Sequence, residues 1–523
     1  MTPLAPRLAA ALAAAGCDTM FGLPGGGPNL DVIGAAEAAG MRFVLGHGET
    51  AATIMAGAYG LLTRQPTPVV VTRGPGAVSA ANGVAQATLD RAPVVVITDT
   101  VPADQVQRVA HQRIDQRALM APLAKRSATI SDQTLDDDLA DLIGAAVRWP
   151  YGAVHLDYDV SAPATQPAPC PPSAGGPRDA SAITRARELI DRARRPVVIV
   201  GVEAAALCPS LVSKLERFGC PVLTTYQAIG AIPTDHDLWA GLFTNGTLER
   251  PLLEAADLLV TIGLDLVEPI PAAWTLAAPV LRLSSVPQED AYLPADVDLV
   301  GDLPSLVRDL PDGGFDWAAS AGRERREAAR ARVRRQGSGG LGPIELVDAL
   351  IAVAPERLTV TVDAGAHFLA VMPLWPVWRP FGLLISNGLA TMGYALPAAI
   401  GAALARPGEP VVAMTGDGGL GMVLAELETV SRLGLSVTTV VFDDAGLSLI
   451  GVKQGAGQSG PAAVQYGPVD FAQVARAIGM ASVTVRSVDD VAAALSGPWD
   501  GPRLIDTRID PGSYPGLLEV ARG

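Results

Sequence analysis

The segment Gly416–Gly421, with the sequence GDGGLG, carries the most informative chemistry of this chain. It lies between a predicted buried strand, Val411–Thr415, and a predicted helix through Ala425–Ser431. The next predicted strand ends at two acidic residues, Asp443 and Asp444. In form this is the fingerprint of a dinucleotide-binding turn, so an NAD(P)-dependent oxidoreductase is one open interpretation.

The carboxylate of Asp417 argues against a dinucleotide in this turn. It would face the diphosphate that the turn is meant to hold, and the two groups would repel each other unless a cation stood between them. A divalent metal removes the difficulty if Asp417 and a second oxygen ligand hold it, while Gly418 and Gly419 let backbone N–H groups approach the phosphates. Asp444 lies 27 residues after Asp417, which carries the chain over one helix and one strand to the same edge of a parallel sheet. Both carboxylates can then meet one metal ion.

Seven other segments carry a resemblance to known motifs. They are FGLPGGGP (Phe21–Pro28), HGETAATIMAGAYG (His47–Gly60), TRGPGA (Thr72–Ala77), AHQRIDQ (Ala110–Gln116), PLAK (Pro122–Lys125), DAGAH (Asp363–His367) and SNGLATMG (Ser386–Gly393). Together with GDGGLG and its downstream acidic pair, they resemble, in order, the motifs of the thiamine-diphosphate enzymes of the acetolactate synthase, pyruvate decarboxylase and benzoylformate decarboxylase type. The likeness covers essentially the whole chain and is greatest for acetolactate synthase large subunits.

This resemblance implies a set of site residues. Mg²⁺ would be held by Asp417, Asp444 and the backbone carbonyl of Gly446, although the family has asparagine where this chain has Asp443 and Asp444. Glu49 would be the catalytic acid that activates the aminopyrimidine ring of the cofactor. His111 and Gln112 are two further candidate catalytic residues. The remaining cofactor-binding candidates are Pro24, Gly25, Thr72, Pro75, His367, Gly388, Met392, Gly416, Gly418, Gly419 and Leu447.

The resemblance also implies partners and substrate. The family assembles its site between subunits, so a homodimer or homotetramer is expected. The substrate would be a small 2-oxo acid, which is decarboxylated and then joined to a second carbonyl compound; simple decarboxylation, as in benzoylformate decarboxylase, is the alternative. Lys453 stands where acetolactate synthases commonly have tryptophan or glutamine, and it is either a surface lysine or a ligand of a substrate carboxylate. FAD in the central domain stays open but is not favoured, because LSSVPQED (Leu283–Asp290) lacks the usual Asp-containing strand end. A non-catalytic member of the family is disfavoured by the intact Glu49 and metal motif.

The elements that must position these residues form three α/β units. We expect an N-terminal pyrimidine-binding domain over 1–163, a central α/β domain over 179–312 and a C-terminal diphosphate- and metal-binding domain over 342–523, each a doubly wound parallel sheet. The Pro- and Ala-rich stretch Ser161–Arg178 and the segment Gly337–Pro343 are predicted linkers. The basic run Arg323–Arg335 is interpreted as a solvated linker helix.

Composition limits the function classes. The 523 residues are too many for one core, and 49% hydrophobic with only 5% aromatic residues suits buried parallel strands between Ala-rich helices. A formal charge of -15 would repel nucleic acid and anionic membranes, so neither partner is expected. There is no apolar run of membrane-spanning length and no secretory leader pattern. Four cysteines without metal-ligand spacing fit a reducing compartment, and a cytoplasmic enzyme is expected.

Overall fold

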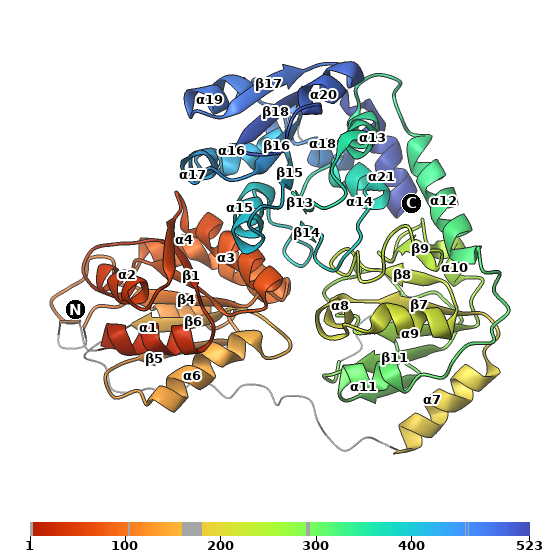
Figure 1. Cartoon of the computed structure of the whole chain (residues 1–523), viewed down its shortest axis with the longest axis horizontal. Coiled ribbons are helices and arrows are strands. Elements are labelled where there is room, and N and C mark those ends of the chain that lie inside the picture. Colours follow the sequence, from red (N-terminus) through yellow and green to blue (C-terminus); the bar gives the residue numbers. More distant parts are fainter. Residues whose placement is uncertain (1–3, 103–104, 159–179, 289–292, 456, 459) are drawn as a thin grey trace.

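The computed structural model describes residues 4–102, 105–158, 180–288, 293–455, 457–458 and 460–523. These residues form three parallel six-stranded sheets with helices on their faces, which confirms the predicted fold class (Figure 1). The predicted linker Ser161–Arg178 lies outside the described residues. No helix in the described part of the chain is long and apolar enough to cross a membrane.

The first sheet has the strand order β2-β1-β3-β4-β6-β5, with all pairs parallel. Its two central strands, β3 and β4, are fully buried and consist mainly of Val and Ile, as a sheet covered on both faces requires. Its elements are α1 (Leu4–Ala14), β1 (Thr19–Leu23), α2 (Pro28–Ala38), β2 (Arg42–Leu45), α3 (Glu49–Thr63), β3 (Thr67–Val71), α4 (Pro75–Leu89), β4 (Val94–Asp99), α5 (Gln116–Met120), β5 (Arg126–Ile130), α6 (Asp136–Gly144) and β6 (Val154–Tyr158).

The second sheet has the order β12-β11-β10-β7-β8-β9. Its elements are α7 (Ala180–Arg192), β7 (Pro196–Val200), α8 (Val202–Leu207), α9 (Leu211–Phe218), β8 (Val222–Thr224), β9 (Trp239–Leu242), α10 (Arg250–Leu253), β10 (Leu258–Ile262), β11 (Val280–Ser284), β12 (Val297–Val300) and α11 (Leu303–Arg308).

The third sheet, β14-β13-β15-β16-β18-β17, repeats the topology of the first. Its elements are α13 (Pro343–Val353), β13 (Thr359–Val362), α14 (Phe368–Leu374), β14 (Leu383–Ile385), α15 (Ala395–Ala405), β15 (Val411–Gly416), α16 (Asp417–Met422), α17 (Glu426–Arg432), β16 (Val437–Asp443), α18 (Ser448–Lys453), α19 (Phe471–Ala477), β17 (Ala481–Val485), α20 (Val488–Leu495), β18 (Arg503–Arg508) and α21 (Tyr514–Arg522). The GDGGLG segment is thus not an open turn, because helix α16 begins at Asp417 itself.

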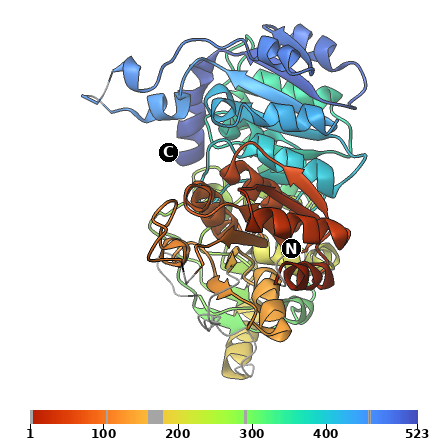
Figure 2. The ribbon, with the colours of Figure 1, turned by 90° about the vertical axis from the view of Figure 1, so that its left-hand side faces the viewer.

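The first and third sheets pack on each other through equivalent helices. Helices α3 and α15 each follow the second strand of their sheet, and they share one hydrophobic core (Figures 1 and 2). Small residues allow the contact, since a Cβ atom on Gly401 would overlap the backbone carbonyl of Met55. The N-terminal domain is therefore fixed against the C-terminal domain of the same chain.

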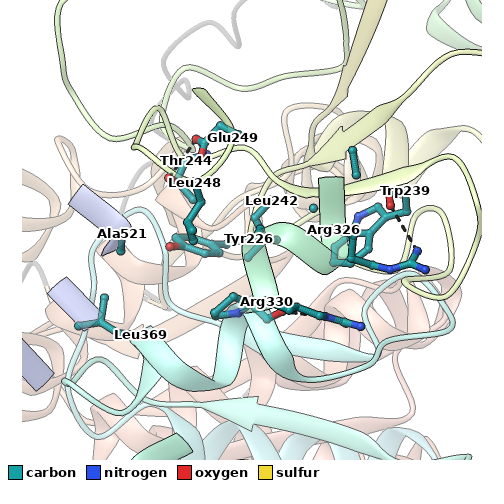
Figure 3. Close-up of a pocket in the computed structure, with 14 residues that line it drawn as sticks. Tyr226, Trp239, Leu242, Thr244, Leu248, Glu249, Arg326, Arg330, Leu369 and Ala521 are labelled. Carbon is teal, nitrogen blue, oxygen red and sulfur yellow. Dashed lines mark hydrogen bonds between the residues drawn. The ribbon is translucent and has the colours of Figure 1, made fainter. Parts of the chain in front are cut away.

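Helix α12 (Ala321–Arg334) corrects the interpretation of a solvated linker helix. Arg326 is buried and donates hydrogen bonds to the carbonyls of His236 and Trp239 in the central domain. One turn later Arg330 donates to the carbonyl of Pro373 at the end of α14 and lies over the Trp239 ring (Figure 3). The basic residues on this face therefore join two domains through backbone carbonyls, which a count of charges along the sequence does not reveal.

Candidate functional site

The segments predicted to carry the site meet at one edge of the third sheet. His367 follows β13, Met392 follows β14, Gly416–Gly419 follow β15, and Asp444 follows β16. Strands β13 and β15 are neighbours, and the chain leaves them toward opposite sides of the sheet, which makes their carboxyl ends a topological switch point. Ligands of doubly wound sheets bind at such a point.

A cavity of about 210 Å³ opens at this edge. Its lining includes the candidates His367, Met392, Gly416, Asp417, Gly418, Gly419, Asp444, Gly446 and Leu447, together with Tyr514, which the motifs did not indicate. The structure therefore brings nine of the predicted residues around one space.

Two acidic residues, Asp417 and Asp444, line this cavity. Asp417 is buried and accepts the backbone N–H groups of Gly418 at 2.7 Å and Gly446 at 3.2 Å. Burial is the main cause that raises the pKa of Asp417, and burial together with the Asp417 charge raises the pKa of Asp444 to about 6. Paired, partly desolvated carboxylates of this kind favour a hard divalent cation.

The loop that carries Gly446 is held open by a short antiparallel bridge. Leu447 donates to the carbonyl of Val464 at 2.7 Å, and Tyr466 donates to the carbonyl of Ala445 at 3.3 Å. Neither bond uses the carbonyl oxygen of Gly446. In the described part of the chain no group of three or more His, Cys, Asp and Glu side chains is arranged for a metal, and the groups at this edge that could bind a cation include the Asp417 and Asp444 carboxylates.

Asp443 belongs to a different network from Asp444. Its carboxylate is buried and pairs with the Arg508 guanidinium at 2.6 Å, and Arg508 also binds Asp506 on the adjacent strand. Successive side chains at the end of a strand point to opposite faces, so only one of the two aspartates can face Asp417. That residue is Asp444.

His367 presents an unpaired nitrogen at the same cavity. The ring is buried, stacks on Phe442 with centroids 5.1 Å apart, and its Nε2 atom has no hydrogen-bond partner. Burial lowers the pKa of His367 to about 4, so the ring is neutral at pH 7. An orphaned buried nitrogen beside a glycine-rich helix start is a position where an incoming polar ligand would complete the hydrogen bonding.

Glycine is required at position 418 because the space above it is already filled. A Cβ atom there would lie 2.8 Å from Leu447, 3.0 Å from the Tyr466 hydroxyl and 3.6 Å from Met392. The Tyr466 hydroxyl also hydrogen-bonds to Asp417, and burial with the nearby carboxylates raises the pKa of Tyr466. Tyr466 was missed at the sequence level, since a single tyrosine in a long loop has no periodicity or motif that would mark it.

The N-terminal candidates gather at the corresponding edge of the first sheet. Pro24 and Gly25 follow β1, Glu49 follows β2 and begins α3, and Thr72 and Pro75 follow β3. Gly25 packs so closely on Thr72 that a Cβ atom on Gly25 would overlap the Thr72 hydroxyl. A Cβ atom on Gly76, the next residue of α4, would lie 3.4 Å from the Glu49 carboxylate, so Glu49 lies beside the start of α4.

Glu49 does not line the cavity around Asp417. The loop before it is held by the C-terminal domain instead: Glu426 accepts the His47 backbone N–H at 2.9 Å, and Glu428 pairs with the His47 ring at 2.7 Å. These anchors on α17 were also missed from the sequence, because they join residues nearly 400 positions apart. The two edges are therefore separate sites within one chain.

Three other candidates lie outside the Asp417 cavity. Gln112, with a φ of 57°, lines a cavity on the N-terminal domain beside Arg73, and His111 is exposed. Gly388 lines an adjoining cavity of about 550 Å³ between the central and C-terminal domains, and Lys453 lines the same cavity. This second cavity shares Ala364, Gly365, Ala390 and Leu449 with the first.

Comparison with known proteins matches all three domains to one family. The models "Thiamine pyrophosphate enzyme, N-terminal TPP binding domain", "central domain" and "C-terminal TPP binding domain" match residues 3–119, 183–310 and 363–507. The chain is 31% identical to acetolactate synthase of Bacillus subtilis (strain 168), over 95% of this chain and 91% of the relative. It is 30% identical to the catabolic acetolactate synthase of Raoultella terrigena (97% and 95%) and 28% identical to the isozyme 1 large subunit of Escherichia coli K12 (95% and 92%).

The chain is a thiamine pyrophosphate enzyme of the acetolactate synthase type. This membership removes the reason to interpret GDGGLG as a dinucleotide turn, because the same segment lies inside the C-terminal TPP-binding match.

The central domain of this thiamine pyrophosphate enzyme has its own switch point between β10 and β7, where a dinucleotide such as FAD would bind. The carboxylate of Glu268 occupies it. Glu268 accepts the backbone N–H of Val202, at the start of α8, at 3.1 Å and that of Asp265 at 2.9 Å, and it also bonds to the Thr225 hydroxyl. Burial raises the pKa of Glu268 to about 8. A buried carboxylate on the N–H group that would receive a phosphate does not fit FAD.

Proposed function

We propose that this enzyme uses thiamine diphosphate and Mg²⁺ to decarboxylate a small 2-oxo acid and to join the product to a second carbonyl compound. The observation that carries the proposal is the cavity lined by both Asp417 and Asp444 together with His367, whose Nε2 atom has no hydrogen-bond partner. Membership of the family supplies the cofactor, and the donor set at this edge fits its diphosphate with a divalent metal.

In this proposal the three sheets correspond to a pyrimidine-binding domain, a central domain and a diphosphate-binding domain, with boundaries near 1–163, 179–312 and 342–523. Asp417, Asp444 and the Gly446 carbonyl would hold Mg²⁺, and the N–H groups at the start of α16 would approach the diphosphate. Met392 and Leu447, which already crowd Gly418, would support the cofactor from below. When bound, thiamine diphosphate supplies a thiazolium carbon that adds to a carbonyl group and accepts the electrons released with CO₂.

The residue that would provide acid–base catalysis in this proposal is Glu49. Its carboxyl would hydrogen-bond to the pyrimidine ring of the bound cofactor and would assist acid–base chemistry at that ring. Glu49 lies at a different sheet edge from the metal candidates of its own chain, so the proposal places Glu49 of one copy against the Asp417 cavity of another, in a homodimer or a pair of dimers.

The adjoining cavity of about 550 Å³ favours carboligation over simple decarboxylation. It gives a second carbonyl compound a place next to the reacting carbon, and the basic side chains of Lys453 and Arg522 line it. Within the described residues neither side chain has an ion-pair partner, so a carboxylate-bearing acceptor such as a second 2-oxo acid suits this space. Simple decarboxylation of the benzoylformate type is the second candidate.

A substrate panel tests the proposal. Purified enzyme with thiamine diphosphate and Mg²⁺ is given pyruvate, 2-oxobutyrate and benzoylformate, and both CO₂ and the coupled product are measured. We expect CO₂ release from aliphatic 2-oxo acids with a 2-hydroxy-3-oxo acid as product, whose alkyl group on C2 comes from the acceptor. Aldehyde as the sole product would establish the simple decarboxylase, and absence of CO₂ from every 2-oxo acid would overturn both candidates.

A further inference from the structure

One face of α4 spans the contact between the N-terminal and C-terminal domains. Asn82, Gln86 and Asp90 follow one another at intervals of four residues, so they lie on the same side of the helix and its C-cap. The start of this helix borders Glu49 through Gly76, and the other end borders Gly388. A 15-residue helix is about 22 Å long, so α4 is a rigid element between the two predicted parts of the site.

Asp90 holds the start of the segment Ser386–Met392 of the C-terminal domain. Its Oδ1 atom accepts the backbone N–H of Gly388 at 2.6 Å and that of Asn387 at 3.1 Å. The same oxygen accepts the amide of Gln227 from the central domain at 3.1 Å, and Oδ2 accepts the amide of Gln86 at 2.8 Å. Asp90 is 2% exposed, so three domains meet on one buried carboxylate.

The other end of the same segment is held by Asn82. The Thr391 hydroxyl donates to the Asn82 side-chain oxygen at 3.1 Å, one residue before Met392. Between these two points the segment packs closely on α4, since a Cβ atom added to Gly388 would lie 2.7 Å from Leu89. The segment that ends in Met392 is therefore fixed by α4 at both of its ends.

We propose that Asp90 is a positioning residue, which with Asn82 sets the placement of Met392 in the cofactor cavity. A carboxylate suits this task because four N–H donors converge on it, and a charged acceptor forms stronger hydrogen bonds than a neutral one. Replacing the carboxylate with a neutral amide would weaken the hydrogen bonds that hold the N–H groups of Asn387 and Gly388, because a neutral acceptor binds them less strongly. The segment would then move, and Met392 with it. The catalytic consequence rests on the proposed function, whereas the movement of Met392 does not.

The matched variants are Asp90→Asn and Asn82→Ala, with Asp265→Asn as the control. The Asp265 carboxylate also joins the N-terminal and central domains, through a 2.6 Å bond to Arg91, but it does not touch the Ser386–Met392 segment. Asp90→Asn is isosteric, and the free Oε1 atom of Gln86 can accept its new amide after rotation. Asn82→Ala changes an exposed residue, so it tests the other end of the segment in a protein that folds.

The first measurement needs no substrate: the methyl NMR signals of [¹³C-methyl]methionine enzyme, with Met392 assigned by Met392→Leu. We expect the Met392 signal to shift in Asp90→Asn and Asn82→Ala and to stay in place in Asp265→Asn. The second measurement is steady-state kinetics with cofactor present. Relative to wild type, kcat of Asp90→Asn should fall roughly ten- to hundred-fold while KM for the 2-oxo acid changes little, since a small misplacement of a positioned group has this effect. An unmoved Met392 signal in both α4 variants would overturn the inference. Moved signals in an enzyme without activity on any 2-oxo acid would instead refute the proposed function alone.

Discussion

The two aspartates of the cavity differ in how much of their role depends on charge. Asp417 is tied to the backbone at Gly418 and Gly446, so its carboxylate organises the turn as well as offering an oxygen to a metal. Asp444 accepts the Ser448 hydroxyl at 2.7 Å and a backbone N–H of Gly446, and in our proposal it contributes an oxygen ligand that an amide can also provide.

These partners predict different outcomes for two substitutions. Asp417→Ala should abolish measurable binding of Mg²⁺–thiamine diphosphate, because it removes a metal ligand and leaves two N–H groups unpaired. Asp444→Asn should bind the complex within about tenfold of wild type, since one oxygen ligand stays and only charge beside the diphosphate is lost. Isothermal titration at fixed pH measures both. If Asp444→Asn bound no cofactor while remaining folded, its charge would be essential and our assignment of its role wrong.

Glu49 supports a test that separates binding from activation. Glu49→Gln should bind the cofactor almost as wild type does, because the predicted diphosphate and metal ligands lie at another sheet edge. Exchange of the thiazolium proton, followed by hydrogen–deuterium NMR after acid quench, should slow by about 10²–10⁴-fold. Glu428→Gln is a matched control, since Glu428 contacts the same loop through His47 and should leave the exchange rate unchanged. Exchange at the wild-type rate in Glu49→Gln with bound cofactor would identify a different activating residue.

At the scale of the elements, the central domain buries two carboxylates, those of Glu268 and Glu203, whose effect on stability the strand pattern of the sequence does not reveal. Glu268 is fully enclosed and has a pKa raised to about 8, whereas in the unfolded chain it ionises near 4.5. The unfolded state therefore loses this proton first as the pH rises, so Glu268 makes the folded state progressively less stable between about pH 4.5 and pH 8. Glu203, beside Ser285 at the same edge, has its pKa raised to about 7 by burial and acts in the same direction.

In Glu268→Gln, the free energy of unfolding should therefore fall less between pH 5.5 and pH 8 than it does in wild type. The glutamine oxygen can still accept the Val202 N–H, so the fold is retained. Urea unfolding of the apoenzyme at both pH values measures the difference, and Glu254→Gln, an exposed glutamate of the same domain, should behave as wild type.

Titration with FAD should show no binding to the wild-type enzyme. Saturable FAD binding would contradict our conclusion that Glu268 fills the crevice.

The strands and helices were predictable where the sequence pattern is local. The strand predicted at Val411–Thr415 is observed one residue longer, at Val411–Gly416, because a buried parallel strand is a continuous run of mostly apolar residues. Helix α16 was not predictable, since glycines at 418, 419 and 421 argue against a helix and only tertiary packing overrides that preference. The cavity candidates came from motif spacing along neighbouring strands. The contacts of Asp90, Tyr466 and Glu426 could not be predicted from the sequence, because each joins segments whose proximity only the fold determines.

At the scale of the whole molecule, the repeated topology of the first and third sheets places two ligand edges in each chain. The α3–α15 packing fixes these edges relative to each other, and Glu49 stays out of the cavity around Asp417. Apolar side chains lie exposed near both edges, including Val78 on α4 and Met422 on α16. A second copy that covers them would bring a glutamate edge against a metal edge, which is the arrangement the proposed chemistry requires.

Subunit mixing tests this arrangement directly. Glu49→Gln and Asp417→Ala should each be inactive as homodimers, because every site then lacks one essential group. In a dimer formed from one chain of each kind, one site combines the intact Glu49 of one copy with the intact Asp417 of the other, and the second site has neither. Random co-expression at equal levels should therefore restore about a quarter of the wild-type activity, since about half of the dimers are mixed and each has one working site. If the glutamate and the metal ligands of one chain formed a site together, the mixture would stay inactive, and the placement of Glu49 against a second copy would have to be abandoned.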